Sequence, residues 1–188
     1  MQLSSSSSFV DRVIGAIRLD PATYEAVEHD TDATWQAALV VAVAAIFSGV
    51  GSSGGRTGDL VAGVLTSLIF WALFALFAYL VGVYILKGPQ TSATFGEVLR
   101  ALGFSYAPSL FAILGLIPGI GFLIVFIAGV WTLIASVIAL RQALEVSTGR
   151  AVAIAVVALL AMVVVLVIVA TVFGISFVAV DSLTSRPA

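Results

Sequence analysis

Apolar residues in this chain gather into five long runs that short polar stretches separate. A helix needs about 20 apolar residues to cross a hydrocarbon core about 30 Å thick, because each residue advances it by about 1.5 Å. The runs reach or approach this length, and none contains Asp, Glu, Lys, Arg or His. We therefore expect an all-α, polytopic integral membrane bundle. The five predicted spans are Thr34–Val50, Leu60–Leu86, Phe104–Ile117, Ile120–Leu140 and Ala151–Val180.

The third and fifth runs depart from the ordinary span length. Phe104–Ile117 makes only about 21 Å of helix. It either begins earlier, near Leu99, with Arg100 snorkelling to the interface, or forms a re-entrant hairpin with the fourth run. Both versions turn at the break Ile117–Gly121. The fifth run, at about 45 Å, must tilt, bend or project from the bilayer, and Gly174 is the expected bend point.

Two short helices are expected before the first span. Apolar residues recur at helical spacing from Phe9 to Ile17, which predicts a short amphipathic helix on the membrane surface or packed on the bundle. Asp20-Pro21 is a helix-start signal, and the acidic helix that follows should end near His29. The predicted organisation is a disordered serine-rich tail (1–8), cytoplasmic helices (9–33), the five-span domain (34–180) and a polar tail (181–188).

Composition supports this assignment. Of 188 residues, 61% are hydrophobic and 10% are charged, against about 25% charged in ordinary soluble domains. The net charge is −2 and the chain has no basic tract, which argues against nucleic-acid binding. The chain has no cysteine, so disulfides and thiolate chemistry are excluded.

Orientation follows from Lys and Arg, which accumulate on the cytoplasmic side of a membrane. With five spans, the N-terminus and the loops 87–100 and 141–150 share one side and carry six basic residues. The other side carries two, Arg56 and Arg186. This count predicts a cytoplasmic N-terminus and an external C-terminus, and we expect the protein to be integral to the plasma membrane.

The apolar runs offer little chemistry. Proton relays and coupled transporters usually need ionisable groups within the membrane, and here the runs have none. The sequence contains neither G-x-S-x-G nor G-x-x-x-x-G-K. His29 lies one turn from Glu25, which suggests either a weak metal site or a solvated helix face. We therefore expect no enzyme activity, no cofactor and no metal.

The segment Thr94–Arg100 begins a helix at the membrane boundary. Glu97 and Arg100 lie three residues apart and share a helix face. They form either an interfacial ion pair or a contact for lipid head groups or a partner. Hydroxyl side chains within the spans, such as Ser105, are expected to bond to their own or a neighbouring helix.

Several stretches together resemble the Yip1 domain family in its prokaryotic branch. They are FGEVLRALGFSYAP at Phe95–Pro108, LIPGIG at Leu116–Gly121, Trp131, ALRQALEVSTGRA at Ala139–Ala151, and the amphipathic piece Arg12–Pro21. The resemblance implies five spans, a cytoplasmic N-terminus and no known catalysis. The candidate interfacial or partner contacts are Glu97, Arg100, Tyr106, Pro108, Arg141, Glu145 and Arg150.

Eukaryotic members of that family act in vesicle traffic and contact prenylated small GTPases through a cytosolic N-terminal part. That part typically carries Asp-Leu-Tyr-Gly-Pro. Here only Leu19-Asp20-Pro21 occurs, so the resemblance does not extend to GTPase binding.

These observations favour a non-enzymatic scaffold or membrane-organising protein. Its partners would be membrane lipids and another membrane protein or a second copy of the chain. One alternative is a small permease or channel subunit whose pore is lined by hydroxyls and glycines. Another is an accessory subunit of a larger membrane complex.

Overall fold

A computed structural model describes residues 8–52 and 60–184, with Ser52 and residues 173–184 described by their backbone alone. Except for Ser8, the predicted serine-rich tail lies outside the described residues. So do residues 53–59 and the last four residues of the predicted polar tail, 185–188.

The part of the chain that the structure describes is helical and contains no strand. Five segments in it are long and apolar enough to cross a membrane, which confirms the all-α bundle and the number of candidate spans. The elements are α1 (Phe9–Ile17), α2 (Pro21–His29), α3 (Ala33–Ser52), α4 (Leu60–Leu80), the π-helical η1 (Val81–Ile85), α5 (Phe95–Phe104), the 3₁₀-helical η2 (Ala107–Leu116), α6 (Gly121–Ala143) and α7 (Thr148–Thr184).

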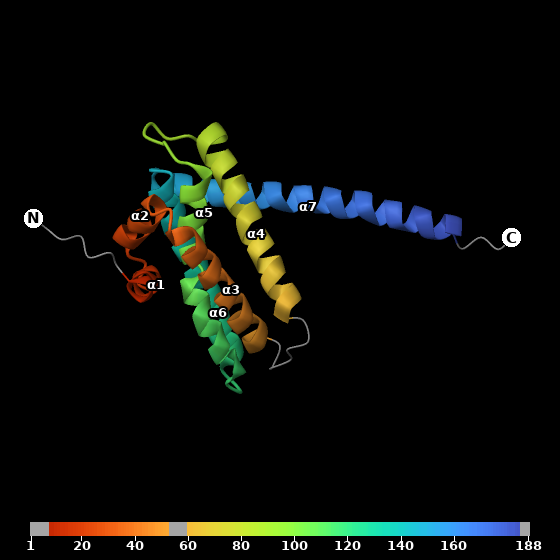
Figure 1. The fold of residues 1–188 in the computed structure, drawn as a ribbon, viewed down its shortest axis with the longest axis horizontal. Helices are drawn as coiled ribbons and strands as arrows, with labels where there is room; N and C mark the ends of the chain where they lie inside the picture. Colours follow the sequence, from red (N-terminus) through yellow and green to blue (C-terminus); the bar gives the residue numbers. More distant parts are fainter. Residues whose placement is uncertain (1–7, 53–59, 185–188) are drawn as a thin grey trace, which may run out of the picture.

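The central bundle consists of α3, α4, α6 and the continuous pair α5–η2 (Figure 1). The first four spans, α3, α4, α5–η2 and α6, run in alternating directions, and α1 and α2 pack at the end where α3 begins. The turn between η2 and α6 lies at the far end, beside the C-terminus of α3. This hairpin therefore runs the length of the bundle, which favours a full crossing over a re-entrant loop.

The third span begins at Phe95, nine residues before Phe104 and four before Leu99, the earlier start that the sequence left open. Pro108 has no N–H to donate, and the chain tightens here into a 3₁₀-helix, with the Ser109 N–H bonded to the Tyr106 carbonyl at 2.9 Å. A 3₁₀-helix rises about 2.0 Å per residue, so α5 and η2 together extend roughly 35 Å. That length suffices for a bilayer core of about 30 Å.

Small residues allow the helices to approach closely at the centre of the bundle. A Cβ atom on Gly103 would lie 2.5 Å from Ala37 Cβ and 3.0 Å from Trp71 Cζ2. The Trp71 indole N–H donates to the Leu99 carbonyl at 3.1 Å, which ties α4 to α5. Trp71 is therefore a packing residue in the bundle.

Helix α7 leaves the bundle crosswise (Figure 1). Its first turns pack on α4 and α6 through one buried stripe, Ala151, Ile154, Ala158 and Met162. The apolar side chains of Val163–Val172 are almost all exposed. The helix continues without interruption through Gly174, the bend point expected from the sequence.

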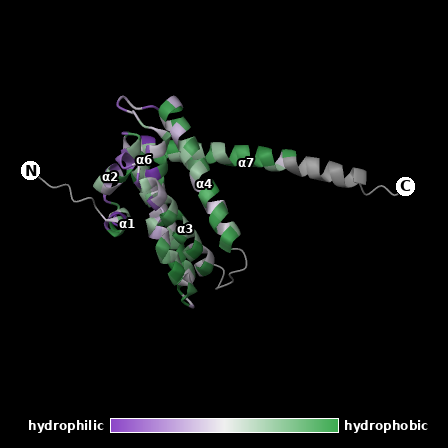
Figure 2. Cartoon of the chain, in the orientation of Figure 1, coloured by the Kyte–Doolittle hydropathy of each residue, from purple (hydrophilic) through white to green (hydrophobic). Residues whose placement is uncertain are grey.

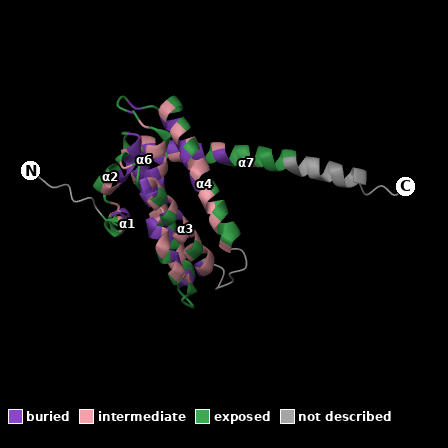
Figure 3. Cartoon of the chain, in the orientation of Figure 1, coloured by how far each residue is buried: buried purple, intermediate pink, exposed green. Residues whose placement is uncertain are grey.

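Hydropathy and burial divide the molecule in the same way. Hydrophilic residues gather around α1, α2 and the adjoining turns, whereas the spans are hydrophobic (Figure 2). Large apolar side chains are exposed along α4, α6 and α7 (Figure 3). Phe122, for example, is 86% exposed. An apolar exterior of this extent requires a hydrocarbon environment or a partner.

Candidate functional site at the polar end of the bundle

We call one end of the bundle the polar end. It comprises α1, α2, the loop 86–94, the first turns of α5 and the turn between α6 and α7. The segments that the charge count assigned to a common side of the membrane thus lie at one end of the molecule. The local start signals are confirmed as well. Asp20 accepts from the Ala22 N–H and caps α2, and Thr94 forms a capping box with Glu97.

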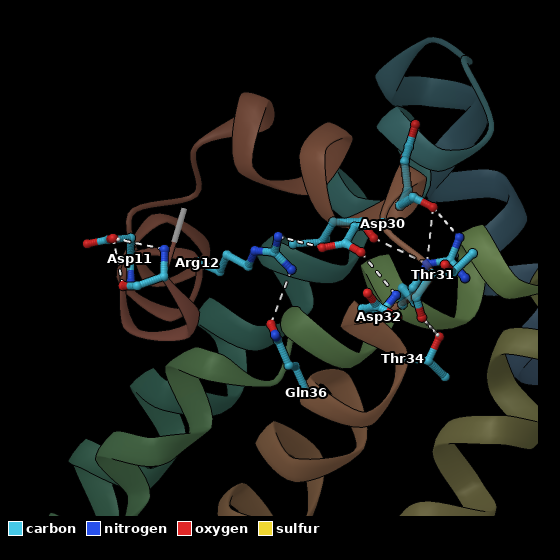
Figure 4. A network of polar contacts seen from close by, with 11 residues as sticks. Asp11, Arg12, Asp30, Thr31, Asp32, Thr34 and Gln36 are labelled. Atoms are coloured by element: carbon cyan, nitrogen blue, oxygen red, sulfur yellow. Dashed lines mark hydrogen bonds and ion pairs between the residues drawn. The ribbon is translucent and has the colours of Figure 1, made fainter. Parts of the chain in front are cut away.

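Arg12 fastens α1 to the rest of the polar end. Its side chain is buried, and Nη2 contacts the Asp30 carboxylate at 2.5 Å while Nη1 donates to the Gln36 side chain at 3.2 Å (Figure 4). The hydrogen bond from Arg12 lowers the pKa of Asp30. Asp11 points away from this network and accepts from Ser8 instead.

The amphipathic pattern of α1 left open whether the helix lies on the membrane surface or packs on the bundle. Phe9, Val13 and Ile17 pack against the hydrophobic core, so α1 is docked on the bundle. Val10 and Ile14 nevertheless remain 60% and 41% exposed. Helix α1 therefore has one docked face and one free apolar face.

Arg100 fastens α2 to the third span. The side chain is buried and its Nε donates to the main-chain carbonyls of Val27 at 3.2 Å and Glu28 at 3.1 Å, with a further contact from Nη2 to the Glu28 carbonyl. The Glu97 carboxylate accepts from the Thr94 N–H at 2.8 Å. The two side chains thus serve different contacts, and Arg100 neither pairs with Glu97 nor snorkels outward.

Glu28 is buried directly beside this arginine contact. Its side chain is 7% exposed, Oε1 lies 3.7 Å from His29 Nε2, and Oε2 has no hydrogen-bond partner. Burial, together with the negative charges of Glu97, Glu25 and Glu145, raises the pKa of Glu28 to about 7, against a smaller lowering by Arg100.

An open pocket of about 850 Å³ adjoins Glu28. Thr91 joins the loop 86–94 to the end of α6 beside this pocket. Its hydroxyl donates to the Leu144 carbonyl at 2.8 Å and accepts from the Gly88 N–H at 2.9 Å. The lining comes from α2, the loop 86–94, the end of α6 and the turn that follows it. It consists of Glu25, Glu28, His29, Gln90, Arg141, Gln142, Glu145 and Val146.

The structure brings together some of the candidate contacts and separates others. Arg141 and Glu145 line the polar pocket, and Arg150 lies at the start of α7, near Gly88. Tyr106 and Pro108 lie further along the third span, Pro108 fully buried and Tyr106 half-buried beside two other cavities.

Glu28 and Thr91 were not among the site residues expected from the sequence. The helical spacing of Tyr24, Val27 and Glu28 was a signal for Glu28, and the structure buries all three on α2. Nothing local marks Thr91, whose partner Leu144 is 53 residues away. Within the described residues, no three His, Cys, Asp or Glu side chains are grouped to hold a metal ion.

Hydroxyl groups join the third and fourth spans, as expected. Ser105 lies 3.0 Å from Ser136, and Ser109 lies 2.7 Å from Thr132, oxygen to oxygen. Thr132 also donates to the Ala128 carbonyl of its own helix. These contacts account for the hydroxyls as packing groups.

Comparison with known proteins places this architecture in a family. The Yip1 domain matches residues 14–170, which include all five candidate spans except the last two residues of the fifth, as well as most of the polar end. No match was found among curated proteins or among solved structures. Members of the matched family are not known as enzymes. With its apolar helices and this match over most of its length, the chain belongs to the Yip1 domain family and is a membrane-type protein.

Proposed function

We propose that this protein is a non-enzymatic scaffold that organises a membrane through contacts with lipid and with another membrane protein or a second copy of itself. The observation that carries this proposal is the two-faced helix α1. Its docked face is held by Arg12, whereas Val10 and Ile14 are exposed beside the bundle. An apolar face held against a membrane domain is suited to lipid or to a partner helix.

The proposal also specifies location and lineage. The polar end faces the cytoplasm of a plasma membrane and the C-terminus lies outside, which the distribution of Lys and Arg supports. Membership of the prokaryotic branch is supported by the order and spacing of the stretches Phe95–Pro108, Leu116–Gly121 and Ala139–Ala151. Glu97, Arg141, Glu145 and Arg150 remain the proposed interfacial contacts.

The test replaces both Val10 and Ile14 with Glu. Arg18→Glu is the matched control, because Arg18 is an exposed polar residue directly after the same helix. Photo-crosslinking from α1 and the native mass of the gently solubilised protein are measured. We expect the double variant to lose crosslinks and any assembly, whereas the control keeps both. If the double variant retains both, the scaffold proposal is wrong.

A permease subunit is the second candidate. The observation favouring it is Tyr106, which lines cavities of about 470 Å³ and 320 Å³ within the spans. Ser136 lines the larger and Ser109 the smaller. Substrate-dependent flux in proteoliposomes that Tyr106→Phe or Ser105→Ala alters would favour the permease. A discrete large native mass would favour an accessory subunit.

A further inference from the structure

We propose that the pocket at the polar end binds a primary ammonium group, with the Glu28 carboxylate as its main acceptor. This inference goes beyond the scaffold role and does not depend on it. It starts from a buried carboxylate that the protein leaves without a hydrogen bond.

The unpartnered oxygen is the first observation. The Glu28 side chain is 7% exposed and lines the pocket, and its Oε2, which is itself shielded from solvent, accepts no hydrogen bond. His29 does not supply one, because its Nε2 lies 3.7 Å from the other oxygen. A buried acceptor without a donor is costly in a folded protein, so a donor that a ligand brings to Oε2, once the carboxylate turns toward the pocket, would be bound favourably.

The charge of the lining is the second observation. Glu25, Glu28 and Glu145 contribute three carboxyls to the wall, and Arg141 contributes its one guanidinium. Arg100 lies close by, but its donors are directed at the main-chain carbonyls of α2. The pocket therefore attracts a cation.

The kind of cation follows from the groups present. Quaternary ammonium ions are typically held in aromatic cages, and no Phe, Tyr or Trp lines this pocket. No described trio of His, Cys, Asp or Glu is grouped for a metal ion. A primary ammonium has three N–H donors. It can donate to Glu28 and at the same time to neighbouring acceptors such as Glu25 and Glu145.

Two sources could supply this group. Arg141 lies in the last turn of α6, a candidate span, so the pocket opens at the membrane boundary. The head group of an ethanolamine phospholipid would place its ammonium near Glu28 and its phosphate near Arg141, a favoured phosphate partner. A free diamine in solution carries the same ammonium chemistry.

Cation binding at this site should depend on pH through the protonation of Glu28. Glu28 faces Glu25 and His29 on its own helix, Glu97 and Arg100 on α5, Arg141 on α6, and Glu145 in the turn that follows. With the pKa of Glu28 near 7, binding of a cation should strengthen as the pH rises through about 7.

The experiment uses the full chain in nanodiscs of phosphatidylcholine with and without phosphatidylethanolamine. Retained lipids are counted by native mass spectrometry, and free putrescine is titrated into the phosphatidylcholine discs. Glu28→Gln removes the charge with little change of shape. Asp32→Asn is the matched control, because Asp32 is exposed nearby and does not line the pocket.

We expect the wild type and Asp32→Asn to retain phosphatidylethanolamine over phosphatidylcholine, more strongly at pH 8 than at pH 6. Glu28→Gln should lower this preference about tenfold and remove its pH dependence, as expected for loss of one charge-assisted hydrogen bond. Binding of putrescine without enrichment of the lipid would support the site and identify a soluble amine as the source. If neither amine shows Glu28-dependent binding in variants that remain folded by circular dichroism, the proposal is overturned.

Discussion

At the scale of single residues, buried arginines hold the polar end together. Arg12 and Arg100 are 8% and 7% exposed. Burying a charge is costly unless it is paired or hydrogen-bonded, and each guanidinium here satisfies that condition with groups far away in the sequence. Arg12 contacts the Asp30 carboxylate, whereas Arg100 contacts carbonyl groups that carry no net charge.

Arg100→Ala should therefore destabilise the protein more than removal of a surface arginine. The substitution leaves two buried carbonyls on α2 without their donor, which we expect to cost about 1–3 kcal/mol. Thermal unfolding in detergent measures the effect. Arg18→Ala is the control, because Arg18 is exposed. Equal melting temperatures for the two variants would show that the carbonyl contacts contribute nothing.

The raised pKa of Glu28 predicts that the stability of the fold depends on pH. Burial raises its pKa from 4.5 to about 7, so the folded state holds the proton more tightly than the unfolded state does. The contribution of Glu28 to the free energy of unfolding is fully present below pH 4.5 and is lost as the pH rises through about 7. The loss in free energy of unfolding amounts to about 3 kcal/mol.

Unfolding of the wild type and Glu28→Gln should be measured at intervals between pH 5 and pH 8. We expect stability of the wild type to fall over this range and that of Glu28→Gln to fall less, since Gln resembles the protonated acid. Parallel curves for the two proteins would contradict the assigned burial of Glu28.

At the scale of elements, local helix-start signals in the sequence predicted where helices begin, whereas contacts between distant residues could not be predicted. Asp20-Pro21 and Thr94 begin helices where their side chains can cap them. The start of the third span was placed too late, because the polar residues Glu97 and Arg100 interrupt the apolar pattern. Only the fold shows that Arg100 finds partners 72 and 73 residues away.

Gly103 tests the close packing of α5 on α3 and α4. A Cβ atom there would lie 2.5 Å from Ala37 Cβ, so Gly103→Ala forces the helices apart. We expect a loss of about 1–3 kcal/mol, measured as a lower melting temperature.

Gly129→Ala is the matched control for Gly103→Ala. Gly129 lies inside α6, and a Cβ there meets nothing within 4 Å. This variant should be unchanged or more stable by up to about 1 kcal/mol, because Ala favours a helix over Gly. A destabilisation equal to that of Gly103→Ala would mean that the close helix approach is not the cause.

At the scale of the whole molecule, the chain has a polar end and an apolar exterior. Composition and run lengths predict the membrane class and the five candidate spans, because hydrocarbon thickness sets helix length. They do not predict that α7 runs crosswise from the bundle. They also do not predict the polar pocket, which three segments far apart in the sequence create together.

The most direct test of the account is the accessibility of both termini in intact cells. The protein carries one small tag before Ser8 and another after Thr184, and each is probed with an impermeant reagent before and after permeabilisation. Five crossings with the polar end inside predict that the N-terminal tag reacts only after permeabilisation and the C-terminal tag reacts at once. Both tags reacting from the same side would contradict an odd number of crossings.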